Sequence, residues 1–67
     1  MIKIVRQGNG YRIERHRENK KTEIYNRDGR WSTNYNGALY ISLEEEALRQ
    51  ADRLKRAEVG NNEDSVN

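Results

Sequence analysis

The chain has 67 residues, no Cys, a single His and a net charge of +2. Without Cys there is neither a disulfide framework nor a Cys-based zinc site, and we expect no bound metal and no cofactor. No apolar run approaches the roughly 20 residues of a membrane span, and a Cys-free composition suits a reducing compartment, so we expect a cytoplasmic protein that does not contact a membrane. A chain this short buries only about 60% of its unfolded surface, which leaves a homodimer open as a source of extra stability.

Charge is unevenly distributed along the chain. Residues 1–37 carry nine Lys or Arg against four acidic residues, whereas residues 38–67 carry four basic against seven acidic residues. One interpretation is two ordinary solvated faces. The other is that the basic half meets phosphate groups or an acidic protein surface.

The first half of the chain has the pattern of β-hairpins. Asn9-Gly10 is a strong two-residue turn signal, and Asn26 to Gly29 is typical of a type I turn closed by a left-handed Gly. The sequence "RENK" at 17–20 indicates another turn of less certain type. Between these turns, apolar and polar residues alternate as in half-buried strands. The predicted strands are residues 2–5, 11–17, 22–26 and 30–33.

The register decides which residues share a face of the sheet. A two-residue turn at Asn9-Gly10 pairs Arg6 with Ile13, and an even-length turn at "RENK" pairs Ile13 with Ile24. Tyr25 and Trp31 then lie on the opposite face. A one-residue slip at "RENK" reverses this and places both aromatic residues on the face of Tyr11 and Ile13, so burial of Trp31 stays open at this stage.

The second half predicts one amphipathic helix. Ser42 and Glu45 form a capping box, Glu44 to Glu46 lie at the positive end of the helix dipole, and Gly60 is a good stop. A short apolar stretch at 38–41 precedes the helix, and apolar residues inside it recur at helical spacing. The predicted core consists of Ile2, Ile4, Ile13, Ile24, Leu39, Ile41, Leu43, Ala47, Ala51 and Leu54.

These elements predict an α+β fold. A three- to four-stranded antiparallel sheet packs on one C-terminal amphipathic helix, in the order β-β-β-(β)-α. Residues 1–59 form a single compact domain, and residues 60–67 form a disordered polar tail.

No pattern in the chain indicates an enzyme. His16 has no Ser or Cys partner in a recognisable arrangement, and a lone His on a strand is usually a solvated side chain. Glu44 to Glu46 point in different directions on a helix, so helix-start charge is the favoured interpretation over a metal site or an acid–base site. The Gly-containing turns lack the spacing and the following helix of a phosphate loop.

The candidate site is the basic and aromatic face of the sheet together with the hairpin loops. Lys and Arg neutralise phosphates, and flat aromatic rings stack on bases or fill a groove. The alternative is a solvated face, on which Glu14 and Glu23 would oppose phosphate. The candidate binding residues are Arg12, His16, Lys21, Tyr25, Arg27, Arg30 and Trp31.

Two resemblances suggest a function. Over residues 1–58 the order of elements resembles the sheet-type DNA-binding domains of phage-family integrase N-termini and of plant Apetala-type transcription factors. Length, Cys-free composition and the ending "GRW…ALYISLEEEALRQADRL" resemble small proteins encoded by phages and mobile elements, many of which inhibit host defence.

The second resemblance implies a non-enzymatic inhibitor that binds a host protein or nucleoprotein complex. The first implies a module that binds nucleic acid, namely duplex DNA. A net charge of +2 is low for a dedicated DNA-binding protein and favours protein binding.

Overall fold

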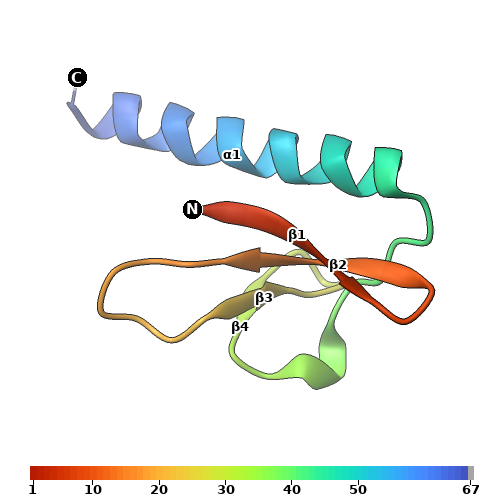
Figure 1. Ribbon diagram of the computed structural model, residues 1–67. Coiled ribbons are helices and arrows are strands. Elements are labelled where there is room, and N and C mark those ends of the chain that lie inside the picture. Colours follow the sequence, from red (N-terminus) through yellow and green to blue (C-terminus); the bar gives the residue numbers. More distant parts are fainter. Residues whose placement is uncertain (67) are drawn as a thin grey trace.

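The computed structural model describes the backbone of residues 1–66 and the side chains of residues 1–58. It contains a four-stranded antiparallel sheet in the order β1-β2-β3-β4, one helix and one 3₁₀ turn. Helix α1 crosses one face of the sheet above β1 and β2, and η1 lies on the other side (Figure 1). The predicted α+β architecture is therefore confirmed. The elements are β1 (Ile2–Gln7), β2 (Gly10–Arg15), β3 (Glu23–Tyr25), β4 (Trp31–Ser32), η1 (Tyr35–Gly37) and α1 (Glu44–Val66).

The first turn lies one residue earlier than the sequence predicts. Gln7 pairs with Gly10, so the two loop residues are Gly8 and Asn9, and Gly8 has a φ of 59°. A positive φ at the first loop position is the geometry of a type II′ turn, which Gly accommodates. Gly10 belongs to β2 instead, where a Cβ would lie 3.2 Å from the carbonyl oxygen of Ile41. Glycine is therefore favoured at Gly8 by its positive φ and at Gly10 by the close approach of the Ile41 carbonyl.

The pairing of β2 with β3 differs from the favoured register by one residue. Glu14, not Ile13, lies opposite Ile24. The connection contains Asn19 in the left-handed region, with a φ of 62°. Asn tolerates that conformation better than most residues. The one-residue slip is therefore the observed arrangement, and every side chain of β3 and β4 lies on the face opposite to the favoured prediction.

The last hairpin is confirmed. Tyr25 pairs with Trp31, and Gly29 closes the loop with a φ of 83° while its amide donates to the carbonyl of Asn26. After β4 the chain passes through η1 and returns along the sheet. There Ala38 bridges to Asn26, and Ile41 bridges to Tyr11.

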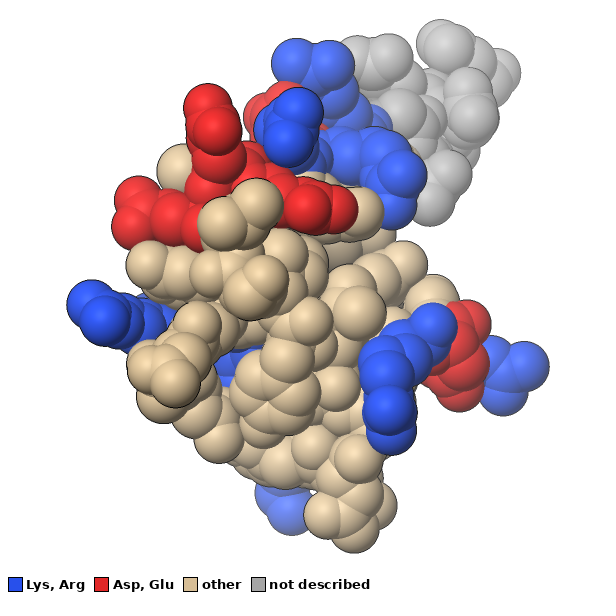
Figure 2. All heavy atoms as spheres, turned by 90° about the vertical axis from the view of Figure 1, so that its right-hand side faces the viewer, with Lys and Arg blue, Asp and Glu red and all other residues tan. Residues whose placement is uncertain are grey.

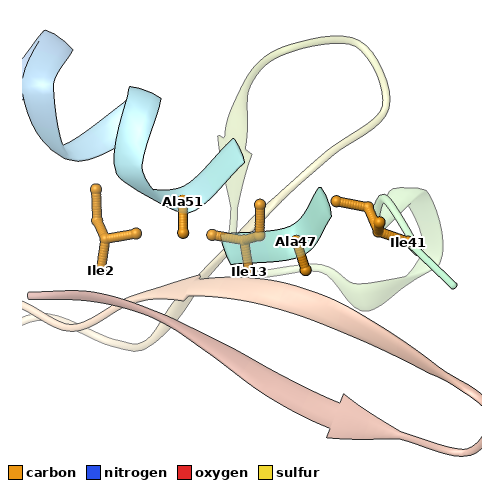
Figure 3. Packing of buried hydrophobic residues seen from close by; sticks show 5 residues of the cluster. All are labelled: Ile2, Ile13, Ile41, Ala47 and Ala51. Carbon is orange, nitrogen blue, oxygen red and sulfur yellow. The ribbon is translucent and has the colours of Figure 1, made fainter. Parts of the chain in front are cut away.

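The main core lies between α1 and the sheet (Figure 3). Ala47 and Ala51 of α1 face the sheet, and their small side chains allow the helix to pack closely against it. Ile4, Leu39 and Leu54 pack at the edge of this cluster, as predicted. Burying one large aliphatic side chain contributes about 1.5–3 kcal/mol, so a core of this size gives a modest total. Its buried members are Ile2, Ile13, Ile41, Ala47 and Ala51.

One predicted core position, Leu43, is wrong, and another, Ile24, is buried on the other face of the sheet. Ile24 is fully buried, but on the outer face, the face turned away from α1, because of the register shift. Leu43 has 63% of its surface exposed because it precedes α1 instead of forming part of the helical stripe.

The helix boundaries also differ from the prediction. The carbonyl of Leu43 accepts the amide of Ala47, and α1 begins at Glu44, so Leu43 and not Ser42 occupies the N-cap position. At the other end, α1 continues past Gly60 to Val66. The predicted disordered tail covers residues 60–67, whose side chains, with all of Asn67, lie outside the described part, and it stays a prediction.

Candidate functional site

The structure separates the seven predicted site residues into three groups. Arg12 of β2 and His16, which directly follows β2, lie on the outer face of the sheet. Tyr25 and Trp31 pack against the core on the helix-facing side. The prediction of one shared basic and aromatic face is therefore wrong, and the cause is the one-residue register shift between β2 and β3. The third group lies in the loops and is exposed: Lys21, Arg27 and Arg30.

A buried carboxylate organises the outer face. Strand geometry places alternate residues of β2 on this face. Glu14 is 5% exposed, and its Oε2 accepts from Nε of Arg12 at 2.7 Å. Its Oε1 lies 2.9 Å from Nε2 of His16, whose Nδ1 is 3.2 Å from the hydroxyl of Thr22. The two outward basic side chains that the sequence offered for binding are thus committed to Glu14.

This pairing changes the acidity of Glu14. Burial raises the pKa of the carboxyl, but hydrogen bonds from Arg12 and His16 outweigh burial and hold the pKa below its ordinary value. Arg12 also donates to the side-chain oxygen of Gln7, and its guanidinium lies 5.3 Å from the ring centroid of Tyr35. These contacts leave Arg12 little freedom to bind a phosphate.

Trp31 takes part in a second internal cluster. Its ring contacts Tyr25 edge-on, with centroids 5.2 Å apart, and the guanidinium of Arg15 lies 4.6 Å from its centroid. Arg15 also donates to Glu23 at 3.0 Å and to Glu58 of α1 at 2.9 Å. Trp31 and Arg15 thereby join β4, β2, β3 and the helix. Tyr25 and Trp31 therefore pack inside the fold and do not form part of an outward surface.

The third group consists of loop cations that no carboxylate holds in place among the described residues. Lys21, Arg27 and Arg30 are exposed, and within the described residues none of the three makes a side-chain ion pair. These three cations are what is left of the predicted basic site, and whether they bind a partner stays a prediction.

A different surface lies at one end of the molecule. Residues 32–43 contain no Lys, Arg, Asp or Glu, in a chain of which 36% is charged. This stretch is called the uncharged segment below. It exposes Tyr35 (48%), Tyr40 (50%) and Leu43 (63%). Figure 2, which views the end where the first turn, η1 and the start of α1 lie, shows a broad uncharged area below the carboxylates of α1. The sequence carries this signal, but its pattern alone indicates only a short apolar stretch at 38–41 before the helix.

Backbone hydrogen bonds hold the uncharged segment against the sheet. Ile41 and Tyr11 exchange two bonds of 2.8 and 2.9 Å, and the amide of Leu39 donates to the carbonyl of Tyr25 at 3.0 Å. The amide of Arg27 donates to the carbonyl of Gly37 at 3.0 Å. Inside the segment, the side chain of Asn34 accepts the amide of Asn36 at 2.9 Å. The exposed tyrosines therefore project from a fixed backbone.

The start of α1 forms one rim of this surface. Glu44, Glu45 and Glu46 are exposed there, and the hydroxyl of Tyr11 donates to Glu44 at 3.0 Å. This bond raises the pKa of Tyr11. The end of the molecule thus combines an uncharged aromatic area with an acidic border.

The comparisons give no family for this chain. No protein-family model matches it, and no curated protein sequence or solved structure shows significant similarity to it. Among the described residues, no three His, Cys, Asp or Glu side chains form a group suited to hold a metal ion. The part of the chain that the structure describes contains no helix with the length and hydropathy needed to cross a membrane.

Proposed function

We propose that the protein is a non-enzymatic protein-binding module that docks through the uncharged segment. The observation that carries the proposal is that the uncharged segment exposes three large side chains, Tyr35, Tyr40 and Leu43, while backbone hydrogen bonds hold it against the sheet. Exposed residues of this size in a single segment are typical of interaction surfaces, whereas isolated ones need no explanation.

The composition of the uncharged segment supports this function. Seven of its twelve residues are Tyr, Ser, Asn or Gly, the residue types that also dominate the binding loops of antibodies. Tyr offers a large contact area with few rotatable bonds, and Asn and Ser provide adaptable hydrogen bonds. Because the sheet already fixes the backbone, binding has to order only side chains, which lowers its entropic cost.

The acidic rim indicates the chemistry of the partner. Glu44 to Glu46 favour a partner whose contact surface is uncharged at its centre and basic at one border, since complementary rim charges speed association. Proteins that bind nucleic acid carry basic patches that could supply such a border. A host protein or nucleoprotein complex, the partner class implied by the resemblance to phage-encoded inhibitors, fits this description.

A second candidate, binding of duplex DNA, now rests on fewer residues. Arg12, Arg15 and Arg17 all pair with carboxylates at 2.6–3.0 Å. The exposed Lys21, Arg27 and Arg30 are the observation that favours this candidate, because free cations contact phosphates.

Two matched triple variants separate the candidates. One replaces Tyr35, Tyr40 and Leu43 with Ala, and the other replaces Lys21, Arg27 and Arg30 with Ala. Each tagged variant and the wild type are used to purify partners from nuclease-treated host lysate, with quantitative mass spectrometry. Loss of a hot-spot side chain costs 2 kcal/mol or more, so we expect recovery to fall by at least about tenfold for the first variant and to stay unchanged for the second. The reverse pattern, or a wild type that recovers no partner, contradicts the proposal.

A further inference from the structure

Strand β1 forms one edge of the sheet. Within the described residues it pairs only with β2. Met1 and His16 exchange two backbone hydrogen bonds, of 2.6 and 2.7 Å, so the odd-numbered residues of β1 direct their backbone groups toward β2. The even-numbered residues direct theirs outward. Ile2 is only 3% exposed, which leaves the amide and carbonyl groups of Ile4 and Arg6 as the open part of the edge.

The side chains beside this open edge have a distinct pattern. Lys3 and Arg6 are exposed, whereas Ile4 and Val5 between them are half-buried. Strand β1 contains no acidic residue, and no ion pair of Lys3 or Arg6 occurs among the described residues. A neighbouring strand would therefore find two unpaired cations and two incompletely covered apolar side chains.

We propose that this edge binds an extended acidic segment of a partner protein by strand addition. A strand paired with β1 exchanges main-chain hydrogen bonds with Ile4 and Arg6 and places side chains directly opposite those of β1. Carboxylates opposite Lys3 and Arg6, with apolar residues opposite Ile4 and Val5, satisfy all four positions. The edge thus selects the pattern acidic–apolar–apolar–acidic.

A second copy of this chain fits the edge poorly. In an antiparallel pair of two β1 strands that share the open backbone groups of Ile4 and Arg6, Lys3 lies opposite Gln7 and Arg6 lies opposite Ile4, so neither cation meets a carboxylate. The partner strand is therefore a different, acidic sequence. This surface uses other residues than the uncharged segment and stands independently of the proposed function.

The test titrates the full chain with two soluble eight-residue peptides. One has the core Glu-Val-Ile-Glu flanked by Thr, and its matched control has Lys in place of both Glu. Amide hydrogen exchange is followed by NMR. We expect the Glu peptide to slow exchange at Ile4 and Arg6 at least threefold and the Lys peptide to leave it unchanged. No slowing with the Glu peptide, equal slowing with both, or concentration-dependent slowing without peptide overturns the proposal.

Variants connect the effect to the edge. Arg6→Pro removes an outward amide without removing a bond to β2, and Pro is tolerated on strand edges, so affinity for the Glu peptide should fall at least tenfold. Unchanged affinity overturns the proposal. If this variant does not fold, the double substitution Lys3→Glu and Arg6→Glu serves instead and should reverse the preference between the peptides. The Ala variant of Tyr35, Tyr40 and Leu43 should bind the Glu peptide normally, which keeps the two proposals distinguishable.

Discussion

The surroundings of Trp31 show whether this residue belongs to the core or to a binding surface. From the sequence it was either a core anchor or part of a basic surface. Its ring is half-buried, contacts Tyr25 edge-on and carries the guanidinium of Arg15. Arg15 in turn reaches Glu58 of α1. The only Trp of the chain therefore fastens the short strand β4 to the rest of the fold.

Replacing Trp31 with Ala should weaken the fold more than binding. The substitution removes the aromatic contact and the cation–π contact, and we expect the free energy of unfolding to fall by about 2–3 kcal/mol in urea denaturation. Trp31→Phe keeps an aromatic ring and should lose about half as much. A variant of unchanged stability that no longer binds its partner would mean that Trp31 is a contact residue.

Glu14 gives a pH dependence with a defined sign. Its pKa in the folded protein lies below the ordinary value, so its stabilising effect is fully present above that value and is lost as pH falls through the folded pKa. Stability should therefore decrease below about pH 4.3, near the pKa of an unfolded Glu. Glu23, whose pKa is lowered by Arg15, adds to the same slope.

The substitution Glu14→Gln isolates this contribution. It should cost about 1–3 kcal/mol at pH 7, because Arg12 loses its charged partner in a half-buried place. It should also flatten the acid limb of the stability curve without abolishing it, since Glu23 remains. Thermal unfolding between pH 2.5 and 7 measures both effects. An acid limb as steep as that of the wild type would show that the Arg12–Glu14 pair contributes nothing.

At the scale of elements, the sequence predicted the order of strands and helix but not their register. Alternation, turn residues and the apolar stripe of α1 are local properties, and they predicted the strands and the helix, although the first turn lies one residue earlier and Leu43 does not belong to the stripe. The register between β2 and β3 depends on whether their connecting loop has an even or an odd number of residues. That loop contains Asn19 in the left-handed region, and its sequence has no clear turn signal. The start of α1 differs from the prediction for a similar reason. The bridge between Tyr11 and Ile41 is a tertiary contact, and it fixes the chain just before the helix.

Gly8 provides a test of the observed first turn. A Cβ at Gly8 meets nothing within 4 Å, so a substitution there costs only backbone strain at a φ of 59°. Gly8→Ala should destabilise the protein by about 1 kcal/mol. A synthetic chain with D-Ala at this position should be at least as stable as the wild type, because a D-residue favours positive φ and restricts the unfolded chain. Equal unfolding midpoints for the L and D variants would contradict the turn at Gly8-Asn9.

At the scale of the whole molecule, internal pairing decides which charges are available. The count of basic residues predicted a cationic face, yet Arg12 and His16 pair with Glu14, and Arg15 and Arg17 pair with Glu23. Of the predicted site residues, only Lys21, Arg27 and Arg30 are exposed without an ion pair among the described residues, and their role in binding stays a prediction. The uncharged segment could not be predicted as a site, because the sequence shows that it lacks charge but not that it is exposed and held by the sheet.

Affinity for duplex DNA should accordingly be weak and only moderately dependent on salt. Contacts through the three exposed loop cations, Lys21, Arg27 and Arg30, give a slope of log K against log salt of about −2.7, since each phosphate contact contributes about −0.9. Fluorescence anisotropy with a labelled duplex between 20 and roughly 200 mM salt measures this slope. A slope steeper than about −6 would mean that DNA contacts many more cations than these three.

Photo-crosslinking tests most directly whether the uncharged segment is the surface that binds a partner protein. A photoreactive phenylalanine analogue replaces Tyr40 in one version of the full chain and Arg27 in another, and both are irradiated in host cells. Docking through the uncharged segment predicts a discrete protein adduct from the Tyr40 position and none from the Arg27 position. A protein or nucleic-acid adduct from the Arg27 position alone would contradict it and place the contact on the basic loops.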